Sequence, residues 1–307
     1  MPVSESRIDH AIRELAATPR NLSENPEDHA RAADWIAAEF EQIGLAVSRQ
    51  TFEIPGVIPE QLPPRQGVNV VGKLNRQPGD SRESRNSHSV VIGAHYDTVP
   101  DSPGADDNAS GVAAMLECAR VLSELGSDRE VTFVAFDAEE IGLLGSAAYV
   151  ARLASAQHPS SAIIFESIGF SSTTVKQCLP GSFRFLFRRM YRAVKQQQFA
   201  ADSLLILSKG PGRAISRHLE ESASKPGIRL PIIPLEVPWW MPLVRDLRRS
   251  DHAPFWLAGI PAVMIGDTAN FRNPHYHQST DTPDTVDVGL VARAARMAID
   301  AIERGAI

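Results

Sequence analysis

Apolar residues along the chain follow two different spacings. Continuous apolar runs bounded by turn residues predict buried strands, and apolar residues spaced three or four apart predict amphipathic helices. The predicted strands span 68–74, 89–95, 130–137, 162–166, 203–207 and 261–266. The predicted helices span 109–125, 144–156, 183–195, 212–224 and 286–303, and the first 25 residues contain a further amphipathic helix. Alternating strands and helices indicate a mostly parallel sheet.

This order of elements predicts one doubly wound α/β domain over residues 1–307, with a mostly parallel, mixed central sheet flanked by helices on both faces. The runs SVVIGA (89–94) and VTFVAF (131–136) are typical of strands covered on both sides. The polar segment 76–88 is expected to form a surface loop. The helix within residues 1–25 is expected to attach more loosely than the rest.

The predicted helix 183–195 separates cationic from apolar residues. Its basic face carries Arg184, Arg188, Arg192 and Lys195, and its apolar face carries Phe183, Phe187, Tyr191 and Val194. A helix that lies on a membrane surface has this pattern, and so has a surface helix with a solvated face. The solvated surface helix is the preferred interpretation.

Composition excludes several classes of protein. The chain has 307 residues, of which 43% are hydrophobic and 22% are charged, as in ordinary globular proteins. A formal net charge of −6 argues against a nucleic-acid partner. Two cysteines, Cys118 and Cys178, form no disulfide framework. Without a signal peptide or an apolar run of about 18 residues, we expect no membrane span and a cytoplasmic protein, or a secreted or periplasmic one if a leader was removed.

Metal-binding side chains follow three of the predicted strands. His95 ends one strand, Glu139 and Glu140 follow the next, and Glu166 ends a third. In open α/β sheets, ligands bind beyond the carboxyl ends of the strands. We therefore expect these side chains to share one crevice.

Two further segments carry candidate ligands. Loop 104–111 (GADDNASG) has two adjacent acids before a predicted helix. One polar residue there could cap the helix, but two acids beside other carboxylates need a cation to stay ionised. In segment 273–282 (NPHYHQSTDT), His275 and His277 alternate, so on extended backbone at most one is expected at the site.

The resulting set of donors contains imidazoles and carboxylates and no thiolate. Such donors suit Zn²⁺, with Co²⁺ or Mn²⁺ as substitutes. Five donors suit two metals when one aspartate bridges them and each metal keeps room for water. A chain of this length buries a core without a metal staple, so the metals are expected to serve chemistry.

The order of five motifs resembles the dinuclear zinc aminopeptidases, metallopeptidase family twenty-eight, which includes relatives of glutamate carboxypeptidase and glutaminyl cyclase. The motifs are GAHYDT (93–98), GADDNASG (104–111), DAEE (137–140), SDH (250–252) and YHQSTDT (276–282). The resemblance runs from about residue 30 to residue 288. It implies an exopeptidase that hydrolyses the N-terminal bond of a peptide or aminoacyl substrate, with a water or hydroxide bridging two zinc ions and a glutamate as general base.

The resemblance assigns metal ligands by position. The implied ligands of the first zinc are His95, Asp107 and Glu166, and those of the second are Asp107, Glu140 and His277. The family often has Asp followed by a hydrophobic residue, Ile and Gly where this chain has Glu166-Ser167-Ile168-Gly169. The longer side chain is expected to alter metal affinity and substrate choice.

The resemblance also implies supporting roles. Glu139 matches the general base, Tyr276 matches a donor to the tetrahedral oxyanion, and Asp97 matches the carboxylate that orients His95. Asp251 and His252 of the SDH motif are expected to support the site.

Two rival functions fit the same motifs. A glutaminyl cyclase-like acyltransferase would use one zinc, and a non-catalytic binding protein would use the fold without turnover. Candidates for an apolar substrate pocket are Phe170, Trp239, Trp240, Met241 and Phe271, and candidates for binding a substrate carboxylate are Arg248, Arg249 and Arg272. The sequence leaves the oligomeric state, the native metal and the preferred N-terminal residue open.

Overall fold

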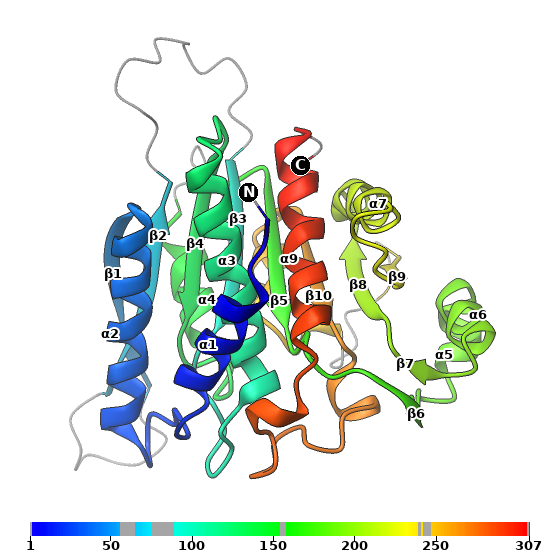
Figure 1. Cartoon of the computed structure of the whole chain (residues 1–307), viewed down its shortest axis with the longest axis horizontal. Helices are drawn as coiled ribbons and strands as arrows, with labels where there is room; N and C mark the ends of the chain where they lie inside the picture. The colour runs from blue at the N-terminus through cyan, green and yellow to red at the C-terminus, as the bar shows by residue number, and fades with distance from the viewer. Residues whose placement is uncertain are drawn as a thin grey trace.

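An eight-stranded mixed sheet forms the centre of the molecule (Figure 1). The computed structural model describes residues 2–55, 65–74, 89–153, 158–238, 241, 247–305 and 307. The strand order is β1-β2-β4-β3-β5-β10-β8-β9. These strands are β1 (Ala46–Ile54), β2 (Arg65–Lys73), β3 (Ser89–His95), β4 (Glu130–Phe136), β5 (Ser161–Glu166), β8 (Leu204–Lys209), β9 (Ile232–Val237) and β10 (Ala262–Gly266). A small second sheet pairs β6 (Ser172–Lys176) with β7 (Ala200–Ala201).

Four parallel strands make the middle of the sheet. β4, β3, β5 and β10 run in one direction, whereas β2 pairs antiparallel with β4 and β8 pairs antiparallel with β10. The central strands are buried along almost their whole length because helices cover both of their faces. The predicted mixed α/β sheet is confirmed, and the carboxyl ends of four neighbouring strands meet at one edge.

Helices cover the two faces unequally. The larger core lies between the sheet and α1 (Glu5–Leu15), α2 (Pro26–Ile43), α3 (Gly111–Glu124), α7 (Gly212–Ala223) and α9 (Val288–Glu303). α3 and α9 lie side by side across this face (Figure 1). The other face is covered by α4 (Leu144–Ala151) and α8 (His252–Leu257), whose Tyr149 and Phe255 pack against Phe136 of the sheet. Among the described helices, none is both long and apolar enough to cross a membrane.

The N-terminal helix is held firmly. Ile8, Ala11, Ile12 and Leu15 on α1 are buried in the larger core, where the helix contacts α3 and α9. The expectation that this helix attaches loosely was therefore wrong, because its apolar face packs against α3 and α9, which lie far along the chain. The single-domain organisation stays a prediction.

Other departures lie near the edges of the sheet. The predicted helix 183–195 is divided at Phe187 into α5 (Phe183–Leu186) and α6 (Arg188–Gln196). The predictions omitted α2, α8, β1, β6, β7 and β9. β1 is largely exposed, so its apolar signal is weak. The predicted loop 76–88 lies outside the described residues.

Candidate metal centre

The carboxyl ends of the central strands bring the predicted metal ligands together. β3 ends at His95 and β5 ends at Glu166, and the turn after β4 carries Glu139 and Glu140. Nε2 of His95 lies 3.5 Å from Oε1 of Glu166. Ligand atoms of His95, Glu139 and Glu166 all lie within 4.8 Å of one another. This arrangement follows from parallel strands that end at the same edge of the sheet.

Asp107 joins this group to a second one. Its Oδ1 lies 3.3 Å from Nε2 of His95, and its Oδ2 lies 3.1 Å from Nε2 of His277. The same His277 nitrogen is 3.3 Å from Oε2 of Glu140. Asp107, Glu140 and His277 form a second set of ligand atoms within 4.8 Å. One carboxylate therefore lies between two imidazoles, with each of its oxygens facing a different one.

The donor atoms of this cluster fit divalent cations. Within the described part of the chain, several buried side-chain atoms lack a hydrogen-bond partner of sound geometry, among them Nε2 of His95, both carboxylate oxygens of Asp107, Oε1 of Glu140 and Nε2 of His277. Buried polar atoms normally have partners. Unpartnered imidazole nitrogens and carboxylate oxygens that converge on one crevice are the ligands that zinc binds.

Asp97 supports both the histidine and the glutamates. Nδ1 of His95 donates to the backbone carbonyl of Asp97 at 3.1 Å, because a carbonyl oxygen can only accept. The proton on Nδ1 leaves the lone pair on Nε2, which faces the crevice. The Asp97 carboxylate accepts hydrogen bonds from the backbone amides of Glu139 at 3.1 Å and Glu140 at 3.2 Å. Asp97 thus positions residues of both groups.

Two residues whose roles the sequence did not reveal hold other ligands in place. The Ser250 hydroxyl donates to Oε2 of Glu166 at 2.7 Å. Asp281 accepts the backbone amide of Asp106 at 2.9 Å with one oxygen and that of Asp107 at 3.1 Å with the other. Both residues lie in motifs that the sequence singled out, but only the folded chain shows which groups they contact.

Burial and neighbouring charges shift the pKa values of several groups in the cluster. Burial raises the pKa of the Glu139 carboxyl well above its usual range, although the nearby His95 partly offsets this. Burial, together with the charge of Asp107, raises the pKa of Glu140 to about 7. Burial alone would lower the pKa of His277, but Asp107 and Glu140 raise it to about 10. The carboxylates of Asp107 and Glu140 therefore favour a positive charge in the crevice, which a metal ion could supply.

The segment that contains Tyr276 and His277 is a turn and not the extended backbone expected from the sequence. His277 has a positive φ of 58° and reaches the cluster, while Nδ1 of His275 is 2.9 Å from the hydroxyl of Thr280. The Tyr276 ring stacks on His277 with centroids 3.9 Å apart. Its hydroxyl accepts a hydrogen bond from Arg249 at 3.1 Å, so Arg249 holds the tyrosine at the rim.

The SDH motif is buried behind the cluster. Burial raises the pKa of the Asp251 carboxyl to about 7. Nε2 of His252 donates to the carbonyl of Leu247 at 3.1 Å, and burial lowers the pKa of this imidazole to about 4. Neither residue belongs to the two ligand groups. Both side chains are buried and supply none of the candidate ligand atoms.

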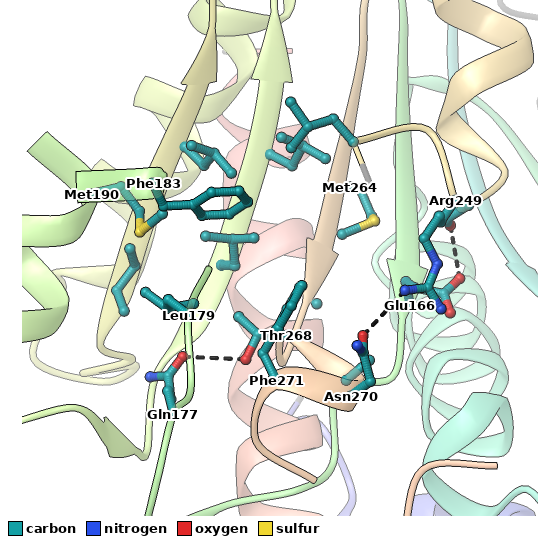
Figure 2. Close-up of a pocket in the computed structure, with 18 of the residues that line it drawn as sticks. Glu166, Gln177, Leu179, Phe183, Met190, Arg249, Met264, Thr268, Asn270 and Phe271 are labelled. Atoms are coloured by element: carbon teal, nitrogen blue, oxygen red, sulfur yellow. Dashed lines mark hydrogen bonds between the residues drawn. The ribbon is translucent and has the colours of Figure 1, made fainter. Parts of the chain in front are cut away.

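An apolar pocket opens beside Glu166 (Figure 2). It encloses about 820 Å³, part of which is open to solvent. Glu166 and Arg249 lie at one end, and Phe183 and Met190 lie at the other. Further lining side chains include Leu179, Leu205, Leu207, Leu235, Met264 and Phe271.

The sequence anticipated little of this pocket. Of the five apolar candidates, Phe271 lines the pocket, Phe170 and Met241 are buried outside its lining, and Trp239 and Trp240 lie outside the described residues. Arg272 is also buried, where it donates to the carbonyl of Phe170 at 2.6 Å, so it is unavailable to a substrate carboxylate.

Sequence comparison identifies the family. Residues 69–204 and 243–302 match Peptidase family M28. The chain belongs to this family. Uncharacterized protein YfbL of Escherichia coli is 29% identical over 94% of this chain and 85% of its own length. Aminopeptidase YwaD of Bacillus subtilis is 39% identical, but over only 42% of this chain and 29% of its own length.

Solved structures of low sequence identity share the fold of this M28 chain. BSAP, a zinc aminopeptidase from Bacillus subtilis, superposes with a TM-score of 0.73 at 19% identity, covering 99% of this chain and 95% of its own. A glutaminyl cyclase from Bacteroides thetaiotaomicron gives a TM-score of 0.71 at 16% identity, covering 99% and 98%. Because both superpose about equally well, the fold alone does not choose between hydrolysis and cyclisation.

Proposed function

We propose that this M28 chain is a zinc-dependent aminopeptidase whose site holds two metal ions. The observation that carries the proposal is the position of Asp107, whose two oxygens lie 3.3 and 3.1 Å from the imidazoles of His95 and His277. His95 and Glu166 would complete one metal site, and Glu140 and His277 the other. When bound, such a pair of ions supplies Lewis-acid activation of water and of the scissile carbonyl.

The protein's own residues would move the protons. Glu139 is buried within reach of His95 and Glu166, and burial raises its pKa, which favours transfer of a proton from water to this carboxylate. It would take a proton from the attacking water and pass it to the leaving amine. The Tyr276 hydroxyl, which accepts from Arg249, would donate its own hydrogen to the developing oxyanion.

The apolar pocket favours a large apolar first residue in the substrate. Glu166 lies at its mouth and, with Glu139, would attract a protonated α-amine, while the side chain would extend toward Phe183 and Met190 (Figure 2). Burying three additional methylene-sized groups favours a leucyl over an alanyl substrate by roughly 2 kcal/mol. We expect kcat/KM for leucyl nitroanilide to exceed that for alanyl nitroanilide by about 30-fold. Equal values for the two substrates would argue against this pocket as the side-chain site.

Removal of the Glu139 carboxylate tests the mechanism. We expect Glu139→Gln to lower kcat on leucyl nitroanilide by about 10²–10⁴-fold, the usual contribution of acid–base catalysis. Its metal content, measured by elemental analysis, should stay at two ions per chain. The matched control is Glu221→Gln, a change at an exposed residue of α7. Normal turnover by Glu139→Gln with both metals bound would show that another group is the base.

Metal content and the reaction product distinguish the proposed aminopeptidase from the acyltransferase and from the non-catalytic binding protein. One zinc per chain with cyclisation of an N-terminal glutamine would favour the acyltransferase. Failure to hydrolyse every member of an aminoacyl-nitroanilide panel with zinc, cobalt or manganese would favour a binding protein.

A further inference from the structure

The segment between Glu166 and Asp202 differs in charge from the rest of the chain. It contains four arginines, two lysines and no acidic residue, although the whole chain has a net charge of −6. Most of these cations lie on α5 and α6, which stand outward beyond the β8–β9 edge of the sheet (Figure 1). Such a concentration of one sign on a projecting element creates a local positive field.

The cations of α5 and α6 are largely unpaired. Arg184, Arg188, Arg192 and Lys195 are exposed, and no ion pair joins them to an acidic residue in the described part of the chain. Arg189 has one distant partner, Glu236, at 3.7 Å. The inner face of α5 and α6 already has contacts within the protein, because Phe183, Met190 and Val194 line the apolar pocket. Only the outer face is therefore free to bind a partner.

Two exposed apolar side chains accompany these charges. Phe185 is 62% exposed and Leu186 is 49% exposed, and they are adjacent at the end of α5. The other large hydrophobic residues exposed on the described surface, Leu125, Ile141 and Leu257, are isolated along the chain. The Arg184 guanidinium lies 4.5 Å from the centre of the Phe185 ring. The aromatic ring, the leucine and the cations are thus all exposed on α5 and α6, and the exposed surface that they make up is called the outer face here.

We propose that the outer face of α5–α6 docks on membrane surfaces that contain anionic phospholipid. Arginine and lysine side chains attract anionic headgroups, and aromatic and leucine side chains enter the boundary between headgroups and acyl chains. A polypeptide with acidic side chains alone would satisfy the charges but would leave Phe185 and Leu186 in water. A lipid surface satisfies both features.

Vesicle sedimentation with the zinc-loaded full chain tests the proposal. We expect binding to vesicles of phosphatidylcholine mixed with phosphatidylglycerol and none to phosphatidylcholine alone. Added salt should weaken the binding because it screens headgroup attraction. The double variant Arg188→Glu/Arg192→Glu should lose at least about tenfold in affinity, given the contribution of each surface cation. Phe185→Ser/Leu186→Ser should also bind more weakly while keeping the salt dependence.

The matched control has the same change in net charge elsewhere. Arg217→Glu/Arg229→Glu reverses the charge of two exposed arginines outside α5 and α6, and this variant should bind vesicles like the unmodified protein. Circular dichroism and hydrolysis of leucyl nitroanilide should be unchanged in all three double variants. Absence of vesicle binding, equal binding to neutral vesicles, full binding by Arg188→Glu/Arg192→Glu, or retention on polyglutamate without vesicle binding would each overturn the proposal.

Discussion

Each carboxylate oxygen of Asp107 faces a different imidazole, and this placement depends on backbone contacts made by another residue. The carboxylate of Asp281 accepts the amides of both Asp106 and Asp107, and its backbone carbonyl accepts the amide of Ala105 at 3.1 Å. Asp281 and His277 belong to the same turn-rich segment. The contact therefore joins the segment that carries one histidine to the loop that carries the shared aspartate.

The contact predicts an effect of Asp281→Asn on metal binding. Asparagine offers one acceptor oxygen and an NH₂ group, so one of the two backbone amides would lose its acceptor. We expect zinc affinity to fall by about 10–100-fold, as for other residues that orient ligands. Competition with a chromophoric chelator measures this. Asp284→Asn, at an exposed position three residues on, should bind zinc normally. Unchanged affinity in Asp281→Asn would show that the loop keeps its position without this carboxylate.

At the scale of elements, Arg20 connects the N-terminal helices to the metal-site loops. It is buried and donates hydrogen bonds to four backbone carbonyls, those of Leu15, Tyr96, Pro103 and Gly104. Burial lowers the pKa of its guanidinium to about 10, so it stays charged at neutral pH. The side chain explains why the segment between α1 and α2 follows the edge of the sheet beside the site.

Replacing this side chain should destabilise the protein. Arg20→Met would leave the carbonyls without donors in a buried region, so we expect the free energy of unfolding to fall by about 3 kcal/mol. Urea-induced unfolding monitored by fluorescence provides the measurement. Arg31→Met removes an exposed arginine from α2 and should change stability by no more than about 0.5 kcal/mol. Equal stability of Arg20→Met and Arg31→Met would contradict a stabilising role for the hydrogen bonds of Arg20.

At the scale of the whole molecule, the metal cluster lies where distant parts of the chain meet. His95 belongs to β3, Glu166 to β5 and His277 to a C-terminal turn, so bound ions would link elements that are separated in sequence. Ligands that bind only the folded state stabilise it according to their affinity and concentration. The metal should therefore contribute to stability as well as to turnover.

Chelation should lower the melting temperature. With zinc at about a thousandfold excess over Kd, linkage gives about 4 kcal/mol, which corresponds to a shift of roughly 10 °C. Differential scanning calorimetry with EDTA, followed by excess zinc, would measure the loss and its recovery. The His277→Ala variant should show a smaller shift. Full metal removal, verified by elemental analysis, without any change in melting temperature would contradict this expectation.

The sequence by itself determined the central strands, the main helices and the chemical types of the metal-site side chains. Local periodicity reports which faces are buried, and residues that directly follow parallel strands meet at one edge. The boundaries of β3 were predicted without error for this reason. The division of 183–195 into α5 and α6 was not visible, because both parts keep an apolar face.

Only the tertiary structure decided which groups touch. The contacts of Asp281, Arg20 and Arg249 join residues that are far apart in the chain or held by irregular backbone, so no local pattern reports them. The pocket beside Glu166 likewise draws its walls from α5, α6, β8, β9 and β10. Local sequence determines periodicity and side-chain chemistry, whereas a cavity or a ligand distance depends on how separate elements pack.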